Sequence, residues 1–372
     1  MIYFDNAATT YPKPKCVYDA VNLGMQKFSF NSGRGSYSSA VETFKMIQNT
    51  REKLAGLVNT APENVVFTSS ATESLNIIIN GLDIQQGDIV FVSPFEHNSI
   101  IRTLHKCGAL IKVIPFSKTD WSLQLTVYND MLAVDKPKAI IISHISNVTG
   151  FELPYEEIFS QAKKHKITTV LDSAQGFGSY TVNPKNVDYL VFAGHKSLYS
   201  VFGIAGFINL CNKKLNIYKA GGTGSDSLNL EMPEELPSRF EAGSLNSVAI
   251  YALNQSIDFI KDNDFASKKH ELTIYLLKQL RELNGLVLYC PPNIITKGIV
   301  AFNVEGYSSD DIGKILSSSY DICVRTGYHC APFVHEFLED KKYAGCVRVS
   351  LSGFNTKKEI DTLVKAIKEI IL

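Results

Sequence analysis

The sequence lacks an excess of charge of either sign. Its 372 residues include 37 Lys and Arg and 37 Asp and Glu, which cancel to a formal net charge of zero. A chain without a global positive field has no general attraction for nucleic acid or for an anionic membrane. The sequence also lacks an apolar run that approaches membrane-spanning length. We therefore expect neither a nucleic-acid partner nor a membrane partner.

Cysteine is scarce, and its spacing shows no pairing. The seven cysteines are an odd number and include no C-x-x-C pair, which disfavours a disulfide framework and a thioredoxin-like redox motif. The opening segment, MIYFDNAATTYPKP, lacks the basic and apolar regions of a secretory signal. We expect a cytoplasmic, reducing location. Six thiols are expected to be buried as small apolar groups: Cys16, Cys107, Cys211, Cys290, Cys323 and Cys346.

The sequence also has no internal repeat, no low-complexity tract and no linker rich in Pro or Ser. Domain boundaries must therefore come from a change in pattern, and the pattern changes near residue 260. A chain of this length is long for one compact domain. We predict a large domain over residues 15–260 and a smaller C-terminal α/β domain over residues 261–372, which residues 1–14 join.

Short apolar runs rich in Val, Ile and Phe are abundant before the pattern changes. They are apolar on consecutive positions and of strand length, which is typical of strands buried on both faces of a sheet. Helical segments separate the runs, so we predict an α/β fold with a mostly parallel sheet of about seven strands between helices. The runs cover residues 65–70, 89–95, 110–116, 139–146, 168–174, 189–195 and 204–210.

Two segments carry the capping-box spacing, in which a serine precedes a glutamate by three residues. Ser39 precedes Glu42 in a long amphipathic segment, and Ser70 precedes Glu73 directly after the first apolar run. The second spacing predicts that a helix begins immediately after a strand that ends at Thr68.

Polar residues follow the apolar runs at the points where strands are expected to end. Ligands of an open parallel sheet bind beyond the carboxyl ends of its strands, so these residues are expected to meet at one edge. Loop polarity or a helix cap would explain any one of them alone. The set comprises Thr72, Glu96, His97, Asn98, Asn147, Asp172, Gln175, His195 and Lys196.

These residue types suit one cofactor. A partly desolvated lysine such as Lys196 has a lowered pKa and can attack a carbonyl to form a Schiff base. Asp172 could pair with a pyridinium nitrogen, and a helix N-terminus at Thr72 offers N–H groups to a phosphate. His97 could lie flat over an aromatic ring. An aldehyde, a pyridine and a phosphate together describe pyridoxal 5′-phosphate (PLP).

Eleven ordered segments then resemble one family, the group II (SUF-type, NifS-like) cysteine desulfurases. These belong to the class V aminotransferase family, a branch of the fold-type I PLP enzymes, and the resemblance implies that fold. It covers nearly the whole chain, and the order makes it specific where a GHK triplet alone would be weak. The segments are YFDNAATT, GRGSY, TSSATES, EHNS, HISNVTG, LDSAQGFG, FAGHK, GGTGS, RFEAGSLN, VRTGYHCAP and VRVSLSGFNT.

The resemblance implies roles for residues around PLP. Lys196 would bind the cofactor as a Schiff base, Asp172 would pair with the pyridine nitrogen, and Gln175 would contact the phenolic oxygen. His97 would stack on the ring and serve in catalysis. Thr72 and His195 would contact the phosphate, and the further cofactor-binding residues would be Ala71, Asn147 and Ser244.

The resemblance also implies a substrate and a reaction. Arg348 would bind the substrate carboxylate bidentately, and Asn147 would lie near both cofactor and substrate. Lys196 would remove the α-proton of L-cysteine, and Cys330 would accept the sulfur as a persulfide, leaving L-alanine. The sulfur would pass to an acceptor protein for iron–sulfur cluster assembly or other sulfur trafficking. Ser244 matches a hydroxyl residue that reaches the phosphate of the neighbouring subunit, which implies a homodimer with shared active sites.

Two residues depart from the family's pattern. Ala193 stands before GHK, where the family often has a Ser or Thr that donates to the phosphate. Tyr37 stands where the family has the histidine of an RG-x-H segment. Neither change removes the lysine, the aspartate or the cysteine, so we expect cofactor binding to survive, with effects on affinity and substrate range.

The segment around Cys330 also allows other interpretations. A free cysteine is usually a buried small hydrophobe, but Gly327 and Pro332 favour a loop here. His329 is a candidate for the positively charged neighbour that a thiolate needs, although adjacency alone does not make it the base. His329, Cys330 and His335 are zinc-type ligands without a fourth at motif spacing, so we predict no metal site.

Two other functions compete with a desulfurase. A selenocysteine lyase would act on L-selenocysteine with the same residues, and the sequence does not separate the two. A sulfur-carrier or scaffold protein that has lost PLP chemistry would keep Cys330, but it would need neither Lys196 nor Asp172.

Overall fold

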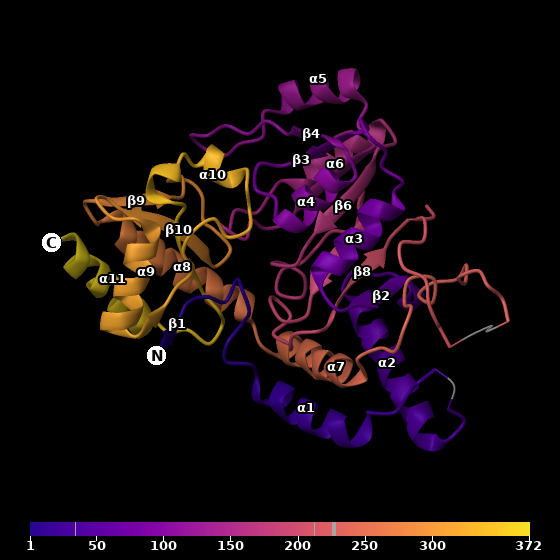
Figure 1. Ribbon diagram of the computed structural model, residues 1–372. Coiled ribbons are helices and arrows are strands. Elements are labelled where there is room, and N and C mark those ends of the chain that lie inside the picture. Colours follow the sequence, from indigo (N-terminus) through magenta and orange to yellow (C-terminus); the bar gives the residue numbers. More distant parts are fainter. Residues whose placement is uncertain (34, 212, 225–227) are drawn as a thin grey trace.

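The computed structural model describes residues 1–33, 35–211, 213–224 and 228–372 (Figure 1). Arg34 and Ser225, which belong to the GRGSY and GGTGS segments, lie outside the described residues. The chain forms a larger part that surrounds a central sheet and a smaller part that contains both labelled termini (Figure 1).

Within the described residues, seven strands form the central sheet in the order β2-β8-β7-β6-β5-β3-β4. β8 is antiparallel to both of its neighbours, and the other pairs are parallel. The predicted α/β fold with a mostly parallel sheet is therefore confirmed. The strands are β2 (Val65–Thr68), β3 (Ile89–Val92), β4 (Leu110–Val113), β5 (Ala139–Ser143), β6 (Thr168–Asp172), β7 (Tyr189–Ala193) and β8 (Ala205–Asn209).

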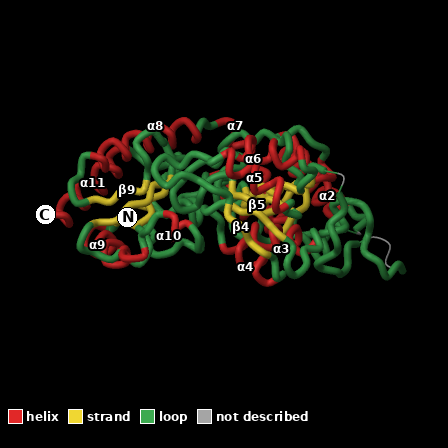
Figure 2. The backbone as a smooth tube through the Cα atoms, turned by 90° about the horizontal axis from the view of Figure 1, so that it is seen from above, coloured by secondary structure: helices red, strands yellow, loops and turns green. Residues whose placement is uncertain are grey.

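Helices cover both faces of this sheet (Figure 2). One face packs against α3 (Ala71–Gly81) and α4 (Asn98–Lys106), which share a hydrophobic cluster with the strands. The opposite face packs against helices of a second cluster: α2 (Ser38–Gly56), α5 (Leu125–Asp135), α6 (Tyr155–Lys164) and α7 (Ser247–Asp262). Outside these, α1 (Lys15–Lys27) packs along α7, and a 3₁₀ turn, η1 (Pro62–Asn64), precedes β2.

The prediction of burial on both faces is wrong for β4. Leu110 and Val113 are exposed, whereas every residue of β5, β6, β7 and β8 is buried. β4 is the edge strand and pairs only with β3 among the described residues, so it has less cover than the inner strands. The apolar sequence of an edge strand does not by itself distinguish it from an inner strand.

The smaller part is built on a three-stranded antiparallel sheet in the order β12-β10-β9. A second pairing joins β1 (Ile2–Tyr3) to β11 (Ile322–Cys323) in parallel, which brings the first residues of the chain beside the segment that leads to Cys330. The division near residue 260 stays a prediction. The remaining elements are α8 (Phe265–Arg281), β9 (Leu286–Tyr289), β10 (Ile299–Val304), α9 (Ser309–Tyr320), α10 (Val334–Phe337), η2 (Lys341–Tyr343), β12 (Val347–Ser350) and α11 (Lys357–Ile371).

The two predicted helix caps have different outcomes. The Ser70 side chain caps α3 by accepting the N–H of Glu73 at 3.1 Å, as the spacing predicts. Glu73 does not complete the box, because its carboxylate accepts instead from the N–H and hydroxyl of Ser69. The box at Ser39 is wrong: α2 begins at Ser38 with Tyr37 as its N-cap, so Ser39 lies inside the helix, and no side chain among the described residues caps it.

This difference predicts unequal effects on stability. Ser70→Ala removes the cap of α3 and is expected to lower the free energy of unfolding by about 1 kcal/mol. Ser39→Ala makes the same chemical change in a helix without that bond, and it is expected to leave stability nearly unchanged. Urea midpoints of the two variants measured side by side test this. An equal shift in both would contradict the assignment of the cap.

None of the helices in the described ranges combines the length and apolar character needed to cross a membrane.

Candidate active site

The polar residues that follow the strands line one pocket. The pocket lies at the carboxyl ends of β5, β6 and β7, whose last residues Ser143, Asp172 and Ala193 face it, and at the starts of α3 and α4. The prediction that these side chains share one sheet edge agrees with this geometry. Of the predicted site residues, the pocket brings together Ala71, Thr72, His97, Asn147, Asp172, Gln175, His195 and Lys196.

Lys196 and Asp172 supply the amine and the carboxyl group of this pocket. Asp172 ends β6, and Lys196 follows the parallel neighbour β7. Burial lowers the pKa of Lys196, and the nearby Asp172 charge opposes that shift. Burial raises the pKa of Asp172, against a 3.0 Å bond from the Ala174 N–H and the charge of Lys196. A lysine with a lowered pKa is more often a neutral amine near pH 7, which is its nucleophilic form.

The start of α3 supplies hydrogen-bond donors to the pocket. Ala71 and Thr72 are the first two residues of the helix, directly after its N-cap Ser70. The first N–H groups of a helix have no intrahelical partner and carry a partial positive charge. This end of the pocket therefore suits an anionic group such as a phosphate.

His195 borders the same pocket with an unused ring nitrogen. Its Nδ1 is buried and has no hydrogen-bond partner among the described residues. Burial, together with the charges of Lys196 and Lys13, lowers the pKa of His195 to about 3, so the ring is neutral near pH 7. The ring stacks on Phe202 with centroids 4.5 Å apart. A buried polar atom without a partner indicates a place where a ligand can supply one.

His97 is held in a defined orientation at the start of α4. Its Nδ1 accepts the Ser99 N–H at 3.0 Å, which caps the helix, so this nitrogen carries no proton. Burial, with a smaller effect of the Lys196 charge, lowers the pKa of His97 to about 4. The ring is therefore neutral near pH 7, with its proton on Nε2.

The N-terminal segment is hydrogen-bonded to two residues that line the pocket, Gln175 and His195. Gln175 Nε2 donates to the carbonyl of Ala7 at 2.8 Å, and the Thr10 N–H donates to the carbonyl of His195 at 3.1 Å. The Lys13 ammonium donates to the same His195 carbonyl at 3.0 Å. Residues from the first part of the chain thus fix the position of residues beside Lys196.

Arg348 lies outside the lining of this pocket but is linked to it through Asn147. Its Nη1 donates to the carbonyl of Asn147 at 2.9 Å, and its Nη2 forms a 2.6 Å ion pair with Asp5. The side chain is buried, and its Nε has no partner among the described residues. Sequence reasoning missed Asp5, although its segment YFDNAATT was a signal available for it.

Cys330 is exposed at the tip of a tight turn, so the predicted loop over residues 327–332 is confirmed. The Ala331 N–H donates to the carbonyl of Tyr328 at 3.0 Å, and the two residues between them have positive φ angles, 45° at His329 and 56° at Cys330. Two positive φ values define a type I′ turn, which favours Asn and Gly. The left-handed region costs other residues roughly 1–2 kcal/mol each, so this turn is strained.

Asn98 and Asn147 both donate hydrogen bonds to backbone carbonyls of this turn. The Asn98 N–H, next to His97, donates to the carbonyl of Cys330 at 2.6 Å. Asn147 Nδ2 donates to the carbonyl of His329 at 2.9 Å. These bonds bring the backbone of the exposed cysteine to the residues that line the pocket.

His329 does not lie beside the Cys330 thiol as a charged partner would. Its ring is buried, and Nε2 donates to the carbonyl of Cys346 at 2.9 Å. Burial and the charge of Arg348 lower its pKa well below the ordinary value. A buried neutral imidazole bonded to backbone supports the turn and supplies no positive charge to a thiolate.

The remaining predicted residues lie elsewhere or differ from expectation. Ser244 is exposed and lines a separate hollow that also includes Tyr37, itself half-exposed. The prediction of buried thiols holds for Cys290 and Cys346. It is wrong for four others, which are partly exposed: Cys16, Cys107, Cys211 and Cys323.

Comparisons with known proteins agree on one family. A family model described as aminotransferase class-V matches residues 2–363. A probable cysteine desulfurase of Methanothermobacter thermautotrophicus is 31% identical over 99% of this chain and 94% of its own. A cysteine desulfurase of Escherichia coli is 29% identical over 100% of this chain and 93% of its own.

Solved structures give the same result. The apo structure of the cysteine desulfurase from Thermococcus onnurineus NA1 has a TM-score of 0.90 and 29% identity, covering 100% of this chain and 94% of that one. A structure titled NifS-like protein has a TM-score of 0.85 and covers 100% of this chain and 99% of its own. At 22% identity, this second likeness concerns the fold alone. The chain belongs to the aminotransferase class-V family.

Proposed function

We propose that this protein is a PLP-dependent cysteine desulfurase that converts L-cysteine to L-alanine and takes the sulfur onto Cys330. One observation carries the proposal: the carbonyl of Cys330, an exposed cysteine on a strained turn, accepts the N–H of Asn98 directly beside the pocket of Lys196. Full-length likeness to proteins named cysteine desulfurase supports it.

The residues of the pocket fit PLP, the cofactor of the class V aminotransferase family. The first N–H groups of α3 and the unpartnered Nδ1 of His195 suit a phosphate. Asp172 suits a pyridine nitrogen, and Lys196 suits an aldehyde carbon. Ala193 offers no hydroxyl to the phosphate, as the sequence indicates. When bound, PLP supplies an aldehyde that takes up amines and a ring that accepts electrons from the substrate.

Lys196 would remove a proton during the reaction, and Asp172 would hold one in place. Because its pKa is lowered, Lys196 would be suited to attack a carbonyl carbon as a neutral amine. Once the substrate amine has displaced it from that carbon, the freed Lys196 amine would remove the proton from the substrate Cα. Asp172 would hold a proton at the ring nitrogen it faces. His97 lines the pocket and carries its proton on Nε2, so it would be a neutral hydrogen-bond donor there.

Arg348 and Asn147 would hold the substrate carboxylate. The guanidinium is oriented by Asp5 and by the Asn147 carbonyl, which leaves its Nε as an unpartnered donor among the described residues. A planar guanidinium can bind a carboxylate through two parallel bonds, whereas a lysine ammonium cannot.

This proposal predicts a binding defect in Arg348→Lys. The loss of one charge-assisted bond is expected to raise the KM for L-cysteine on the order of tenfold or more, with a smaller change in kcat. Arg102→Lys, an exposed change on α4, is the matched control and should leave KM near the wild-type value. Initial rates over a range of L-cysteine concentrations measure both. An unchanged KM in Arg348→Lys would remove this residue from the substrate site.

Cys330 would carry out the sulfur transfer. Its thiolate attacks the substrate sulfur, an S–S bond forms, and the bond between Cβ and sulfur breaks with its electron pair left on the three-carbon fragment. That fragment gains protons and leaves as alanine. The sulfur stays on Cys330 as a persulfide until a thiol removes it, and an acceptor protein that serves iron–sulfur cluster assembly is the partner we propose.

We also propose that two copies form a homodimer in which Ser244 contributes to the partner copy's phosphate site. Ser244 is exposed in one chain, and the hollow that it lines also contains two exposed aromatic side chains, Phe30 and Tyr37. Exposed apolar side chains of this kind are typical of an interface. Sedimentation of the full chain tests the dimer, and a monomer at micromolar concentration would contradict it.

The direct test of function uses the purified full chain with PLP, L-cysteine and a thiol reductant. Equal amounts of alanine and sulfide are expected, and a yellow protein distinguishes a PLP enzyme from a colourless scaffold. L-selenocysteine is the competing substrate. A large kcat/KM ratio in its favour would indicate a selenocysteine lyase instead, and the absence of alanine from both substrates would overturn the proposed function.

A further inference from the structure

The turn that carries Cys330 is contacted by His335, a residue that has no role in the proposed chemistry. His335 lies on α10 and is 1% exposed. Its Nε2 is 2.8 Å from the carbonyl of Tyr328, the first residue of the turn. The same carbonyl closes the turn by accepting the Ala331 N–H. His335 is therefore bonded to the atom on which the strained conformation of Cys330 depends.

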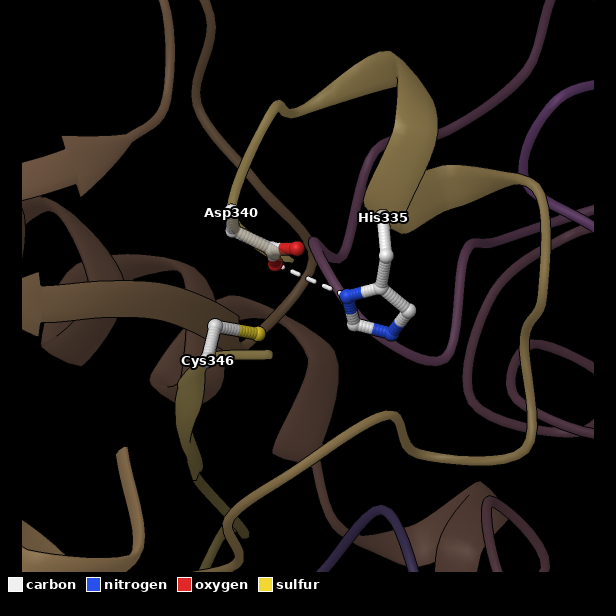
Figure 3. Close-up of side chains that lie close together, drawn as sticks. All are labelled: His335, Asp340 and Cys346. Carbon is white, nitrogen blue, oxygen red and sulfur yellow. Dashed lines mark hydrogen bonds and ion pairs between the residues drawn. The ribbon is translucent and has the colours of Figure 1, made fainter. Parts of the chain in front are cut away.

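The other ring nitrogen of His335 is bonded to Asp340. Figure 3 shows the two side chains pointing toward one another, with Nδ1 2.8 Å from Oδ2. Asp340 is fully buried. The Tyr328 carbonyl can only accept a hydrogen bond, so Nε2 of His335 carries a proton and donates to it. The hydrogen bond between Nδ1 and Asp340 joins the other side of the ring to a buried carboxyl group, and the two bonds hold the ring in one orientation.

Cys346 lies beside this pair (Figure 3). One possible metal-ligand atom from each of the three residues lies within 4.8 Å of the other two. The cluster does not have the geometry of a metal centre. The 2.8 Å separation of Nδ1 and Oδ2 is that of a hydrogen bond and is shorter than the roughly 3.3 Å expected between two ligands of tetrahedral zinc. Burial raises the pKa of the Cys346 thiol well above its ordinary value, so the thiol keeps its proton beside this pair.

We propose that His335 and Asp340 are positioning residues that hold the Cys330 turn in its strained, reactive conformation. The inference rests on the proposed function for its effect on catalysis, but its effect on the turn is independent of it. Asp340 orients the imidazole ring, the ring fixes the Tyr328 carbonyl by donating to it from Nε2, and that carbonyl keeps the turn closed.

Three substitutions separate positioning from a general loss of stability. His335→Asn keeps a donor near the Nδ1 position for Asp340 but removes the bond to Tyr328. His335→Gln places its amide nitrogen near the Nε2 position and keeps the bond to Tyr328. Asp340→Asn lets a neutral imidazole keep both bonds, because the new amide donates to Nδ1. Thr273→Ala, a buried change in α8 away from the turn, is the control for stability.

Hydrogen exchange of the peptide that spans residues 325–331 is the first measurement. His335→Asn is expected to speed local exchange on the order of tenfold, because the turn loses the hydrogen bond to the Tyr328 carbonyl. It is also expected to lower kcat for L-cysteine by about the same factor while KM stays within about twofold. His335→Gln and Asp340→Asn should recover most of both values, and Thr273→Ala should lower the melting temperature without changing exchange of this peptide.

Several results would overturn the inference. These are wild-type exchange in His335→Asn, an equal defect in His335→Gln, a full defect in Asp340→Asn, or one divalent metal ion per chain in the purified protein by elemental analysis. If His335→Asn does not fold, Asp340→Asn still decides through the same two measurements. If the wild type makes no alanine but His335→Asn still loosens the turn, the proposed function fails and the positioning role stands.

Discussion

Lys196→Ala is expected to lower kcat for L-cysteine by about a thousandfold or more, because a methyl group can neither attack a carbonyl nor take a proton. Lys196 is the lysine that follows β7 and faces Asp172, and burial lowers its pKa. The yellow colour that comes from PLP bound to a lysine amine should disappear with the activity. Stopped assays for alanine, together with an absorbance scan, measure both effects.

A second measurement makes this prediction independent of activity. Borohydride reduction of the wild type followed by peptide mass spectrometry should place PLP on Lys196. Lys164→Ala, an exposed change on α6, is the matched control and should keep colour and rate. If the label appears on another buried lysine, such as Lys269, or if Lys196→Ala stays yellow and active, the assignment of Lys196 is wrong.

Cys330→Ala is expected to separate cofactor binding from sulfur transfer. The substitution removes the nucleophile from the turn but leaves the lining of the PLP pocket intact, so the protein should stay yellow. Alanine and sulfide production should fall by at least about a hundredfold, as in other enzymes that lose a nucleophile. Mass spectrometry of the wild type after L-cysteine should show one extra sulfur atom on the peptide that contains Cys330.

The matched control is Cys323→Ala, a partly exposed cysteine in β11 on the same segment of the chain. It should form the persulfide at Cys330 and turn over normally. Should Cys330→Ala release alanine as fast as the wild type, the thiol is not the sulfur acceptor. The selenium and scaffold alternatives would then gain support.

The parts of the fold that the sequence predicts are those with a strong local signal. Apolar runs such as residues 139–142 and 189–193 predict inner strands correctly, because a strand that is covered on both faces favours apolar side chains at consecutive positions. The same signal misjudges β4, since cover depends on neighbours that are distant in sequence. The apolar pattern does not predict β1, because its two residues form a strand only through their pairing with β11.

Some features of the site could also be predicted from the sequence, whereas others could not. The position of Lys196 and Asp172 after adjacent strands follows from the rule for parallel sheets, and the pocket contains both. The link between Arg348 and Asp5 joins residues 343 positions apart, so no local pattern could predict it. The positive φ angles of His329 and Cys330 were equally hidden, because neither residue type favours a type I′ turn. Tertiary bonds impose that conformation.

The pairing of β1 with β11 also affects the order of events during protein synthesis. β1 lies within the first three residues, and its partner lies at residues 322 and 323, so a nascent chain cannot complete this pairing until almost all of it has left the ribosome. The ion pair between Asp5 and Arg348 likewise cannot form until Arg348 has been synthesised. Long-range pairings form late and slowly, whereas the central sheet can assemble from residues made earlier. We therefore expect ribosome-bound chains that end before residue 321 to contain a folded central sheet but an incomplete binding site for the substrate, because Arg348 has not yet been made.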